Sequence, residues 1–209
     1  MHKMVVYMDG GSQAVPGTKR FILSYGVVAH YDDATAELHG ALTEVPSSLS
    51  GSHEHLAFVE TLRHAKALCL APVDIAFVTD DASVCDVNNF ARNFHRLDLE
   101  HNTIKRLVKL LEYMGLHEEL HQYMLDCLFH SKFTKVKGHA RCVYNLRCDE
   151  LAVHARNWAK GDLSPLLPFE EWLHDGHLYY VRELDENGNP TGNNVAKLWY
   201  APFSDLWAA

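Results

Sequence analysis

The sequence contains no apolar run that approaches the roughly 20 residues a membrane-spanning helix requires. It also shows no export signal, because its first residues, Met1 to Met8, are typical of a β-strand. We therefore expect a soluble, cytoplasmic protein that does not associate with membranes.

Cysteine is sparse, and its spacing follows no common framework. The five cysteines are an odd number, and no two are spaced as Cys-x-x-Cys, so neither a disulfide framework nor a common zinc site is indicated. His139, Cys142 and Cys148 could suggest zinc, but their spacing differs from that of common zinc sites. Reduced thiols in a cytoplasm fit this pattern best.

Positive charge is scarce as well. Nineteen Lys and Arg stand against 27 Asp and Glu, a formal net charge of -8, which disfavours binding of nucleic acid through overall charge. A local basic patch or bound cations would have to compensate. Lys105, Arg106 and Lys109 lie about one turn apart on a predicted helix, where they could contact phosphates or form an ordinary solvated face.

The chain of 209 residues with 47% hydrophobic content can build one full-sized core and a small appendage. Composition changes after Gly161, which predicts a domain over 1–161 and a C-terminal extension over 162–209 that packs on it. In the extension, strand-like runs at 179–184 and 195–200 flank a turn-rich segment and predict a long-looped β-hairpin. We expect a monomer.

The first half of the chain predicts strands followed by a βα repeat. Three β-rich runs at 4–8, 21–31 and 37–45 are separated by Gly, Pro and Asp and predict a meander. Ser52 can then cap a helix over 53–70, whose predicted buried face holds Glu54, Phe58, Leu62 and Ala65.

Further elements complete an α/β fold. A short strand at 73–79 is followed by a helix from Asp81 onward, which predicts parallel strand pairing. The segment 97–131 predicts two helices with a break at Gly115, and 133–137 predicts a fifth strand. The last predicted helix, 145–160, has a face of small residues that would lie close to the sheet: Cys148, Ala152, Ala155 and Ala159. We expect a five-stranded mixed sheet flanked by helices.

Four carboxylates are predicted to meet at one edge of this sheet. Asp9 and Asp80 follow the apolar runs of neighbouring parallel strands, and ligands gather at the carboxyl ends of such strands. Glu54 and Asp149, near the starts of two helices, could complete the cluster. Such a cluster is costly unless cations neutralise it, and its hard oxygen ligands suit Mg²⁺ or Mn²⁺. A two-metal site would support hydrolysis of a phosphodiester.

Each carboxylate also has an ordinary interpretation when taken alone. Asp80 could cap a helix, Asp9 could be a turn residue before two glycines, Glu54 could be a first-turn carboxylate favoured by the helix dipole, and Asp149 could be solvated. Their joint placement favours a functional site.

Several segments resemble motifs of the type 1 ribonuclease H family, in the family's order. They are Tyr-Met-Asp-Gly-Gly-Ser at 7–12, His-Glu-His-Leu-Ala at 53–57, Val-Thr-Asp-Asp at 78–81, Val-Lys-Gly-His-Ala at 136–140 and Asn-Leu-Arg-Cys-Asp-Glu-Leu-Ala at 145–152. The resemblance spans residues 4 to 160 and implies a ribonuclease H-like fold.

The resemblance also implies hydrolysis of the RNA strand of RNA–DNA hybrids. It implies that Asp9, Glu54, Asp80 and Asp149 bind two Mg²⁺ or Mn²⁺ ions with substrate bound, and that His139 assists turnover or product release. Substrate contacts would involve Gly10, Gly11 and Ser12, and also Ser50 and Gly51, where family members often carry an Asn pair. Lys105, Arg106 and Lys109 lie in the helical region where some members carry a basic handle.

Two other functions stay open at this point. The chain could be another nuclease of the same fold that acts on DNA or other RNA, because a fold does not determine the substrate. It could instead be a non-catalytic scaffold that binds nucleic acid or protein. The four carboxylates and the Lys-Gly-His-Ala loop favour ribonuclease H.

Overall fold

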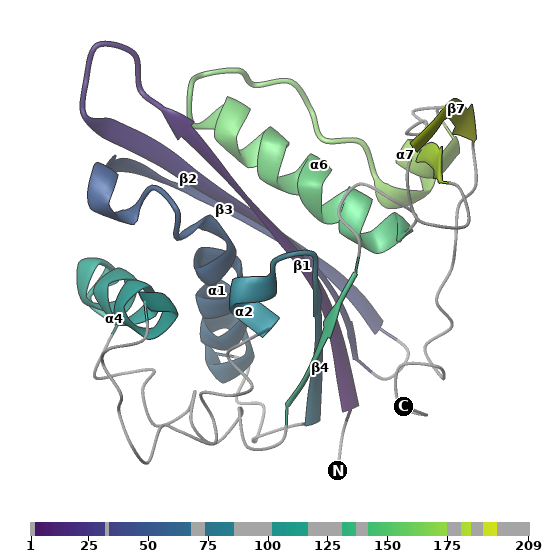
Figure 1. Cartoon of the computed structure of the whole chain (residues 1–209), viewed down its shortest axis with the longest axis horizontal. Helices are drawn as coiled ribbons and strands as arrows, with labels where there is room; N and C mark the ends of the chain where they lie inside the picture. Colours follow the sequence, from purple (N-terminus) through teal and green to yellow (C-terminus); the bar gives the residue numbers. More distant parts are fainter. Residues whose placement is uncertain are drawn as a thin grey trace.

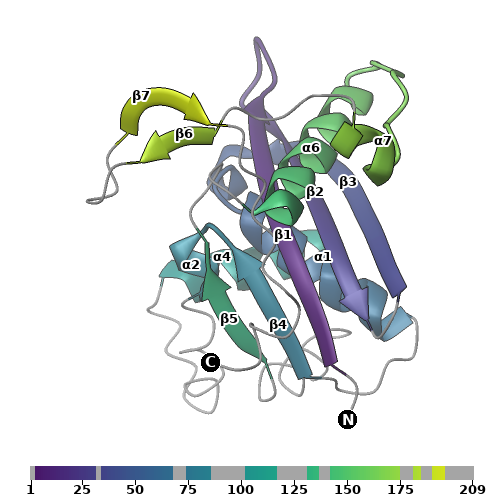
Figure 2. The same ribbon diagram turned by 90° about the vertical axis from the view of Figure 1, so that its right-hand side faces the viewer.

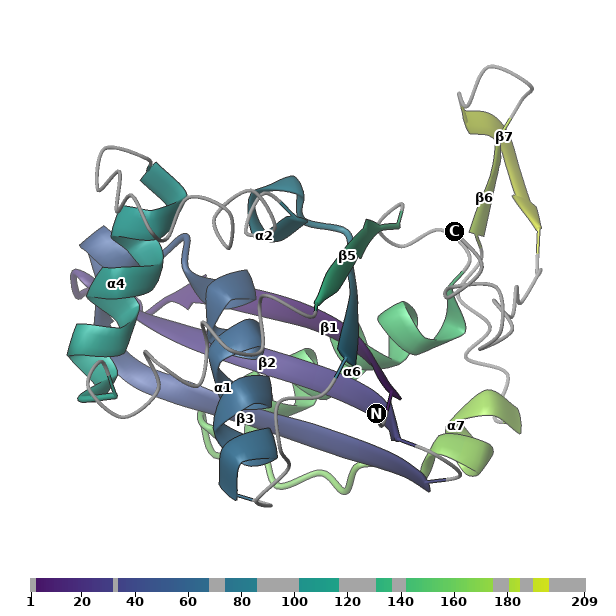
Figure 3. The same cartoon turned by 90° about the horizontal axis from the view of Figure 1, so that it is seen from below.

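The computed structural model describes residues 3–31, 34–67, 74–85, 102–116, 131–136, 142–174, 181–184 and 190–195. Its centre is a five-stranded sheet with the order β3-β2-β1-β4-β5. In Figure 3, α1 and α4 cover one face of this sheet, and α6 covers the other. The predicted mixed sheet with flanking helices is confirmed.

The strands form an antiparallel meander followed by parallel pairs. β1 (Lys3–Ala14), β2 (Arg20–Tyr31) and β3 (Ala34–Pro46) pair antiparallel. β4 (Asp74–Thr79) pairs parallel with β1, and β5 (Lys132–Lys135) pairs parallel with β4. β1 lies at the centre of the sheet, with antiparallel β2 on one side and parallel β4 on the other (Figure 1). The sheet therefore changes from antiparallel to parallel pairing at β1.

The described helices are α1 (His53–Ala67), α2 (Ala82–Cys85), α4 (Asn102–Met114), α6 (Val143–Trp158) and α7 (Phe169–His174), with a 3-10 turn at Ser47–Leu49. α4 ends at Met114, and the next residue, Gly115, has a φ of 69°, so the predicted break is confirmed. The second predicted helix of that region falls largely in 117–130, outside the described residues. No described helix is long and apolar enough to cross a membrane.

Successive side chains of a strand point to opposite faces of the sheet, so the hydrophobic core has one part on each face. Met4, Val6 and Met8 of β1 pack with α1 and α4, whereas Val5 and Tyr7 face α6. On the α6 side, an ideal Cβ at Gly26 of β2 would overlap the Cys148 carbonyl oxygen and lie 2.7 Å from Leu151 Cβ. The absent side chain therefore lets α6 lie directly on the sheet.

Some local predictions are wrong. The Ser52 hydroxyl is buried without a hydrogen-bond partner among the described residues, so it does not cap α1; only the Ser52 carbonyl accepts a bond, from the Leu56 N–H at 2.9 Å. Cys148, Ala152 and Ala155 are buried as predicted, but α6 ends at Trp158, so Ala159 lies beyond the helix and is exposed.

The extension has two described parts. Residues 162–174 follow α6, and α7 packs against its first turns, with Trp172 buried against Val143 and Leu146. Further along, β6 (Val181–Leu184) and β7 (Pro190–Val195) pair antiparallel in a separate two-stranded sheet (Figure 2). β7 lies in the segment predicted as turn-rich; the predicted strand at 195–200 falls, apart from Val195, outside the described residues.

Candidate active site

Three carboxylates from separate elements meet beside the centre of the sheet. One oxygen each from Asp9, Glu54 and Asp80 lies within 4.8 Å of the others. Asp80 directly follows β4, and Glu54 is in the first turn of α1. The three residues are separated by up to 71 positions in the sequence, so only the fold brings them together.

Asp9 does not end β1, contrary to the sequence-based prediction. β1 continues to Ala14 through its antiparallel pairing with β2. The parallel pairing of β1 with β4, however, stops at Tyr7 and Val78. Asp9 is therefore two residues beyond the last parallel pair, where β4 no longer flanks β1 and the side chain can meet Asp80.

Main-chain and side-chain donors orient the two most buried carboxylates. The Gly10 N–H donates to Asp9 Oδ1 at 2.7 Å and to Glu54 Oε1 at 3.0 Å. The Thr79 hydroxyl lies 3.5 Å from Glu54 Oε2. An ideal Cβ at Gly10 would overlap the backbone of His53 and lie 2.8 Å from the Glu54 nitrogen, so only glycine lets β1 approach α1 this closely.

Burial and mutual repulsion raise the pKa values of these carboxyl groups. The pKa of Asp9 is raised to about 6, chiefly by burial and also by the charges of Asp80 and Asp149, while hydrogen bonds with Glu54 and the Gly10 N–H act in the opposite direction. The pKa of Glu54 is raised well above its ordinary value, first by burial and then by the charge of Asp9. Without a cation, burial and the neighbouring charges therefore favour the protonated forms of Asp9 and Glu54 over the charged forms.

Asp149 lies near this group but outside it. It is in the second turn of α6, and its charge raises the pKa of Asp9. Among the described residues, the close group of ligand atoms comprises only the other three carboxylates. The arrangement therefore offers three converging hard oxygen donors, with a fourth carboxylate at the side, which suits binding of divalent cations.

Several predicted substrate contacts flank the cluster, while His139 lies outside the described residues. Gly10, Gly11 and Ser12 continue β1 past Asp9. Ser50 and Gly51 precede α1, and the Arg106 guanidinium of α4 lies 3.6 Å from the position of a Cβ on Gly51. Arg106 and Lys109 are exposed, and Lys105 is half-buried. The fold thus places one residue of the predicted basic patch beside the segment before Glu54.

The structure separates the roles of the two adjacent aspartates. The Asp81 carboxylate accepts the N–H groups of Ser83 and Val84, and these bonds hold its pKa below the ordinary value. Asp81 is therefore the cap of α2, whereas Asp80 joins the cluster. The helix cap that the sequence allowed at Asp80 is therefore made by its neighbour Asp81.

Two neighbours of the cluster were not recognised from the sequence. His55 is fully buried, and burial lowers its pKa to about 4. Arg156 of α6 places its guanidinium against Gly11, two residues beyond Asp9. No local pattern marks either residue, because both positions depend on the packing of helices on the sheet.

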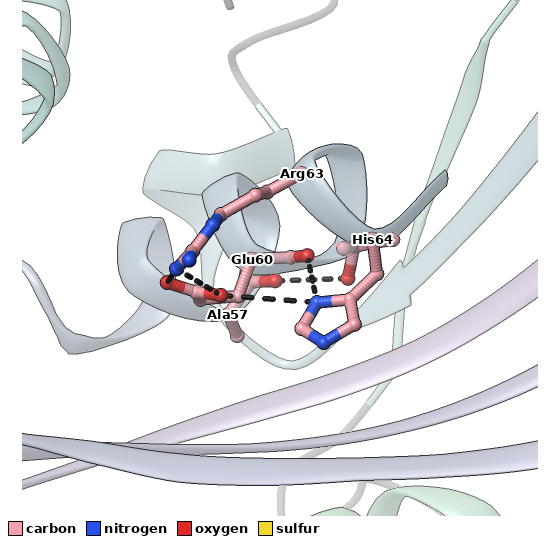
Figure 4. A network of polar contacts seen from close by, with 5 residues as sticks. Ala57, Glu60, Arg63 and His64 are labelled. Carbon is pink, nitrogen blue, oxygen red and sulfur yellow. Dashed lines mark hydrogen bonds and ion pairs between the residues drawn. The ribbon is translucent and has the colours of Figure 1, made fainter. Parts of the chain in front are cut away.

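A second polar network lies farther along α1 (Figure 4). Glu60 is buried, with Arg63 Nη1 at 3.2 Å and His64 Nδ1 at 3.8 Å from its carboxylate oxygens. Glu60, Arg63 and His64 all border a cavity of about 420 Å³, whose other lining residues are Tyr25, Gly40, Ala41, Leu42 and Ala67. No member of the carboxylate cluster lines this cavity.

Comparison with known proteins identifies the family. No family model matches the chain. Two curated ribonucleases H are 31% identical to it: that of Chlorobium luteolum over 153 residues, 73% of this chain and 94% of the relative, and that of Clostridium botulinum over 158 residues, 74% and 96%. The chain belongs to the ribonuclease H family. The resemblance in the sequence motifs is thereby confirmed.

Solved structures agree on the ribonuclease H-like fold. LC11-RNase H1, isolated from compost by a metagenomic approach, matches 77% of this chain and 99% of its own, with a TM-score of 0.51 and 16% identity. LC9-RNase H1, a type 1 RNase H with the type 2 active-site motif, matches 96% and 97%, with a TM-score of 0.58 and 16% identity. At this identity the likeness concerns the fold.

Proposed function

We propose that this ribonuclease H is an endonuclease that hydrolyses the RNA strand of RNA–DNA hybrids. The observation that carries the proposal is the convergence of Asp9, Glu54 and Asp80 within 4.8 Å in a chain of this family. LC11-RNase H1, whose structure covers 75% of this chain at 16% identity and a TM-score of 0.50, has been solved in complex with an RNA/DNA hybrid. That ligand supports the same substrate class here.

The cluster fits a divalent-metal site. Its donors are carboxylate oxygens alone. The raised pKa values of Asp9 and Glu54, caused first by burial and then by neighbouring carboxylates, support neutralisation of the cluster by bound cations. We assign Asp9, Glu54, Asp80 and Asp149 as the residues that would hold two Mg²⁺ or Mn²⁺ ions with substrate bound. Such cations supply an activated water and stabilise the attacking and leaving oxygens of a phosphodiester displacement.

The surrounding residues would position the substrate and move protons. The Gly10 N–H orients Asp9 and Glu54, and Thr79 lies against Glu54, so both carboxylates are held before a ligand arrives. We assign His139 to proton transfer or product release. Substrate contacts are assigned to Gly10, Gly11, Ser12, Ser50 and Gly51, and phosphate contacts to Lys105, Arg106 and Lys109. The catalytic domain is assigned to 1–161 and the extension to 162–209.

One assay compares four substrates of the same sequence: an RNA–DNA hybrid, duplex DNA, duplex RNA and single-stranded RNA. With Mg²⁺ or Mn²⁺, we expect cleavage of the RNA strand of the hybrid alone, leaving 5′-phosphate and 3′-hydroxyl ends. Excess EDTA should abolish it. Robust cleavage in EDTA would exclude the metal mechanism, and preference for duplex DNA or duplex RNA would identify a different nuclease of this fold.

A further inference from the structure

The first turns of α6 meet a part of the chain that follows the sequence motifs resembling ribonuclease H. The resemblance ends at residue 160, whereas Leu167, Phe169 and Trp172 belong to the segment that follows. Figure 1 shows α7 beside the end of α6 that precedes Asp149. Trp172 is buried there against Val143 and Leu146.

Arg147 joins this segment to the sheet. Its guanidinium forms a two-pronged ion pair with Glu37 of β3, with both N–O distances at 2.8 Å, and it also donates to the Leu167 carbonyl at 2.8 Å. Its Cζ lies 5.4 Å from the ring centre of Trp172 and 6.0 Å from that of Phe169. The side chain is only 1% exposed, so the bonds of Nε and Nη2 and the two rings replace part of the water that the charge has lost, while Nη1 has no hydrogen-bond partner among the described residues.

The start of α6 has little intrinsic support of its own. The residue that precedes it, Cys142, makes no side-chain capping bond, and the first turn contains no acidic residue. Caps and first-turn carboxylates normally stabilise this end of a helix. Here Phe169 covers the first turn instead, stacking on Tyr144 with ring centres 5.6 Å apart.

Asp149 lies two residues after Arg147, so any movement of this helix start would displace its carboxylate. At the sheet, the close approach of Gly26 to the Cys148 carbonyl determines how near α6 lies to β2. The residues directly before Asp149 are therefore contacted by β2, by β3 through Arg147 and by the segment 162–174. Ligands of a metal site are sensitive to the groups that orient them, and loss of such a group costs about 10–100-fold in metal affinity or activity.

We propose that Arg147, Phe169 and Trp172 form an aromatic clasp that positions Asp149 for metal binding. The segment 162–174 is then part of the support of the active site. These three are positioning residues, since none touches the carboxylates of the close group. The proposal rests on the assignment of Asp149 to the metal site under the proposed function.

The test uses Trp172→Ala in the full chain, with Trp158→Ala as a matched control. Trp158 also lies on α6, but it is 60% exposed and outside the clasp. The measurements are hydrogen exchange of the amides of 143–150, Mg²⁺ affinity by calorimetry without substrate, and kcat and KM on the hybrid across Mg²⁺ concentrations.

For Trp172→Ala we expect faster exchange in 143–150, a Mg²⁺ Kd raised by about 10–100-fold, and a lower kcat that excess Mg²⁺ partly restores, with little change in the KM for the hybrid. Trp158→Ala should match the wild type throughout. Trp172→Phe, which keeps an aromatic ring beside Arg147, should restore most of the Mg²⁺ affinity. If Trp172→Ala does not fold, Phe169→Leu is measured by the same criteria.

A folded clasp variant that melts at a lower temperature but keeps wild-type Mg²⁺ affinity would overturn the proposal, because the clasp would then be only structural. Failure of the proposed function gives a different result. In that case, the wild type would not cleave hybrid, or Asp149→Asn would keep full activity and Mg²⁺ affinity, whatever the exchange rates of α6.

Discussion

At the scale of single residues, Asp9 couples chemistry to stability. Its pKa is raised to about 6, chiefly by burial and then by the charges of Asp80 and Asp149. A carboxyl group whose pKa is higher in the folded than in the unfolded state stabilises the fold below its unfolded pKa. That contribution is lost as pH rises through about 6. Without metal, the cluster therefore destabilises the protein at neutral pH.

Asp80→Asn should remove activity and yet stabilise the metal-free protein. The neutral amide is a poor ligand for Mg²⁺, but it no longer raises the pKa values of Asp9 and Glu54. Near pH 7 in EDTA we expect a gain of about 1 kcal/mol in unfolding free energy. The gain should shrink when Mg²⁺ is added and as pH falls through about 6. Melting curves at several pH values measure it.

Asp81→Ala is the control for this prediction. It removes the neighbouring carboxylate, which caps α2 and has a lowered pKa, so it should cost about 1 kcal/mol. The stabilising contribution of the Asp81 carboxylate is present above its unfolded pKa and is lost as pH falls. This pH dependence is opposite to that of the carboxylate cluster. An Asp80→Asn protein that is inactive but no more stable than wild type in EDTA would contradict the crowding of these carboxylates.

At the scale of elements, the contact between β2 and α6 determines how closely Asp149 approaches Asp9. α6 is able to lie on β2 because Gly26 has no side chain at the point where the Cys148 carbonyl meets the strand. Packed interiors cannot absorb an added methyl group without displacing backbone or side chains. One glycine therefore controls the position of the helix that carries the fourth carboxylate.

Gly26→Ala should destabilise the protein by about 1–3 kcal/mol, because the new methyl group overlaps the Cys148 carbonyl and displaces α6. For a chain of this size, that lowers Tm by several degrees. Gly51→Ala is the matched control, since its added Cβ would meet only the Arg106 side chain at 3.6 Å. If both variants melt at the wild-type temperature, α6 does not rest on β2 as described.

At the scale of the whole molecule, the extension contributes to the main fold through 162–174. Arg147 is buried between Glu37 and this segment, so loss of the segment would expose the guanidinium and the apolar surface of α6. The sequence change at Gly161 follows the last of the sequence motifs that resemble ribonuclease H. The packing continues beyond it, to α7.

Two shortened chains test where the folding unit ends. A chain ending at Gly161 should lose about 2–5 kcal/mol of unfolding free energy, because it lacks buried aromatic contacts from Phe169 and Trp172. A chain ending at His174 keeps those contacts and should therefore avoid most of that loss. Urea denaturation of both chains and of the full protein gives the comparison. Equal stability of the two shortened chains would show that α7 adds nothing to the fold.

The sequence by itself determined the main strands, the two principal helices and the identity of the clustered carboxylates. Hydrophobic alternation has a period set by local backbone geometry, so it marks β2, β3, α1 and α6 wherever they later pack. The motifs around Asp9, Glu54, Asp80 and Asp149 are also local, and their order along the chain identified the family before any contact was known.

Only the tertiary structure decided features that depend on partners distant in the sequence. β1 extends past Asp9 because β2 continues to pair with it after β4 has ended. Asp80 joins the cluster while Asp81 caps α2, although the two are chain neighbours with the same chemistry. Arg147 forms an ion pair with Glu37, which is 110 positions away in the sequence. Local sequence patterns do not specify such contacts. Each contact forms where two elements distant in the sequence pack together, and the burial of a side chain on one element depends on the other.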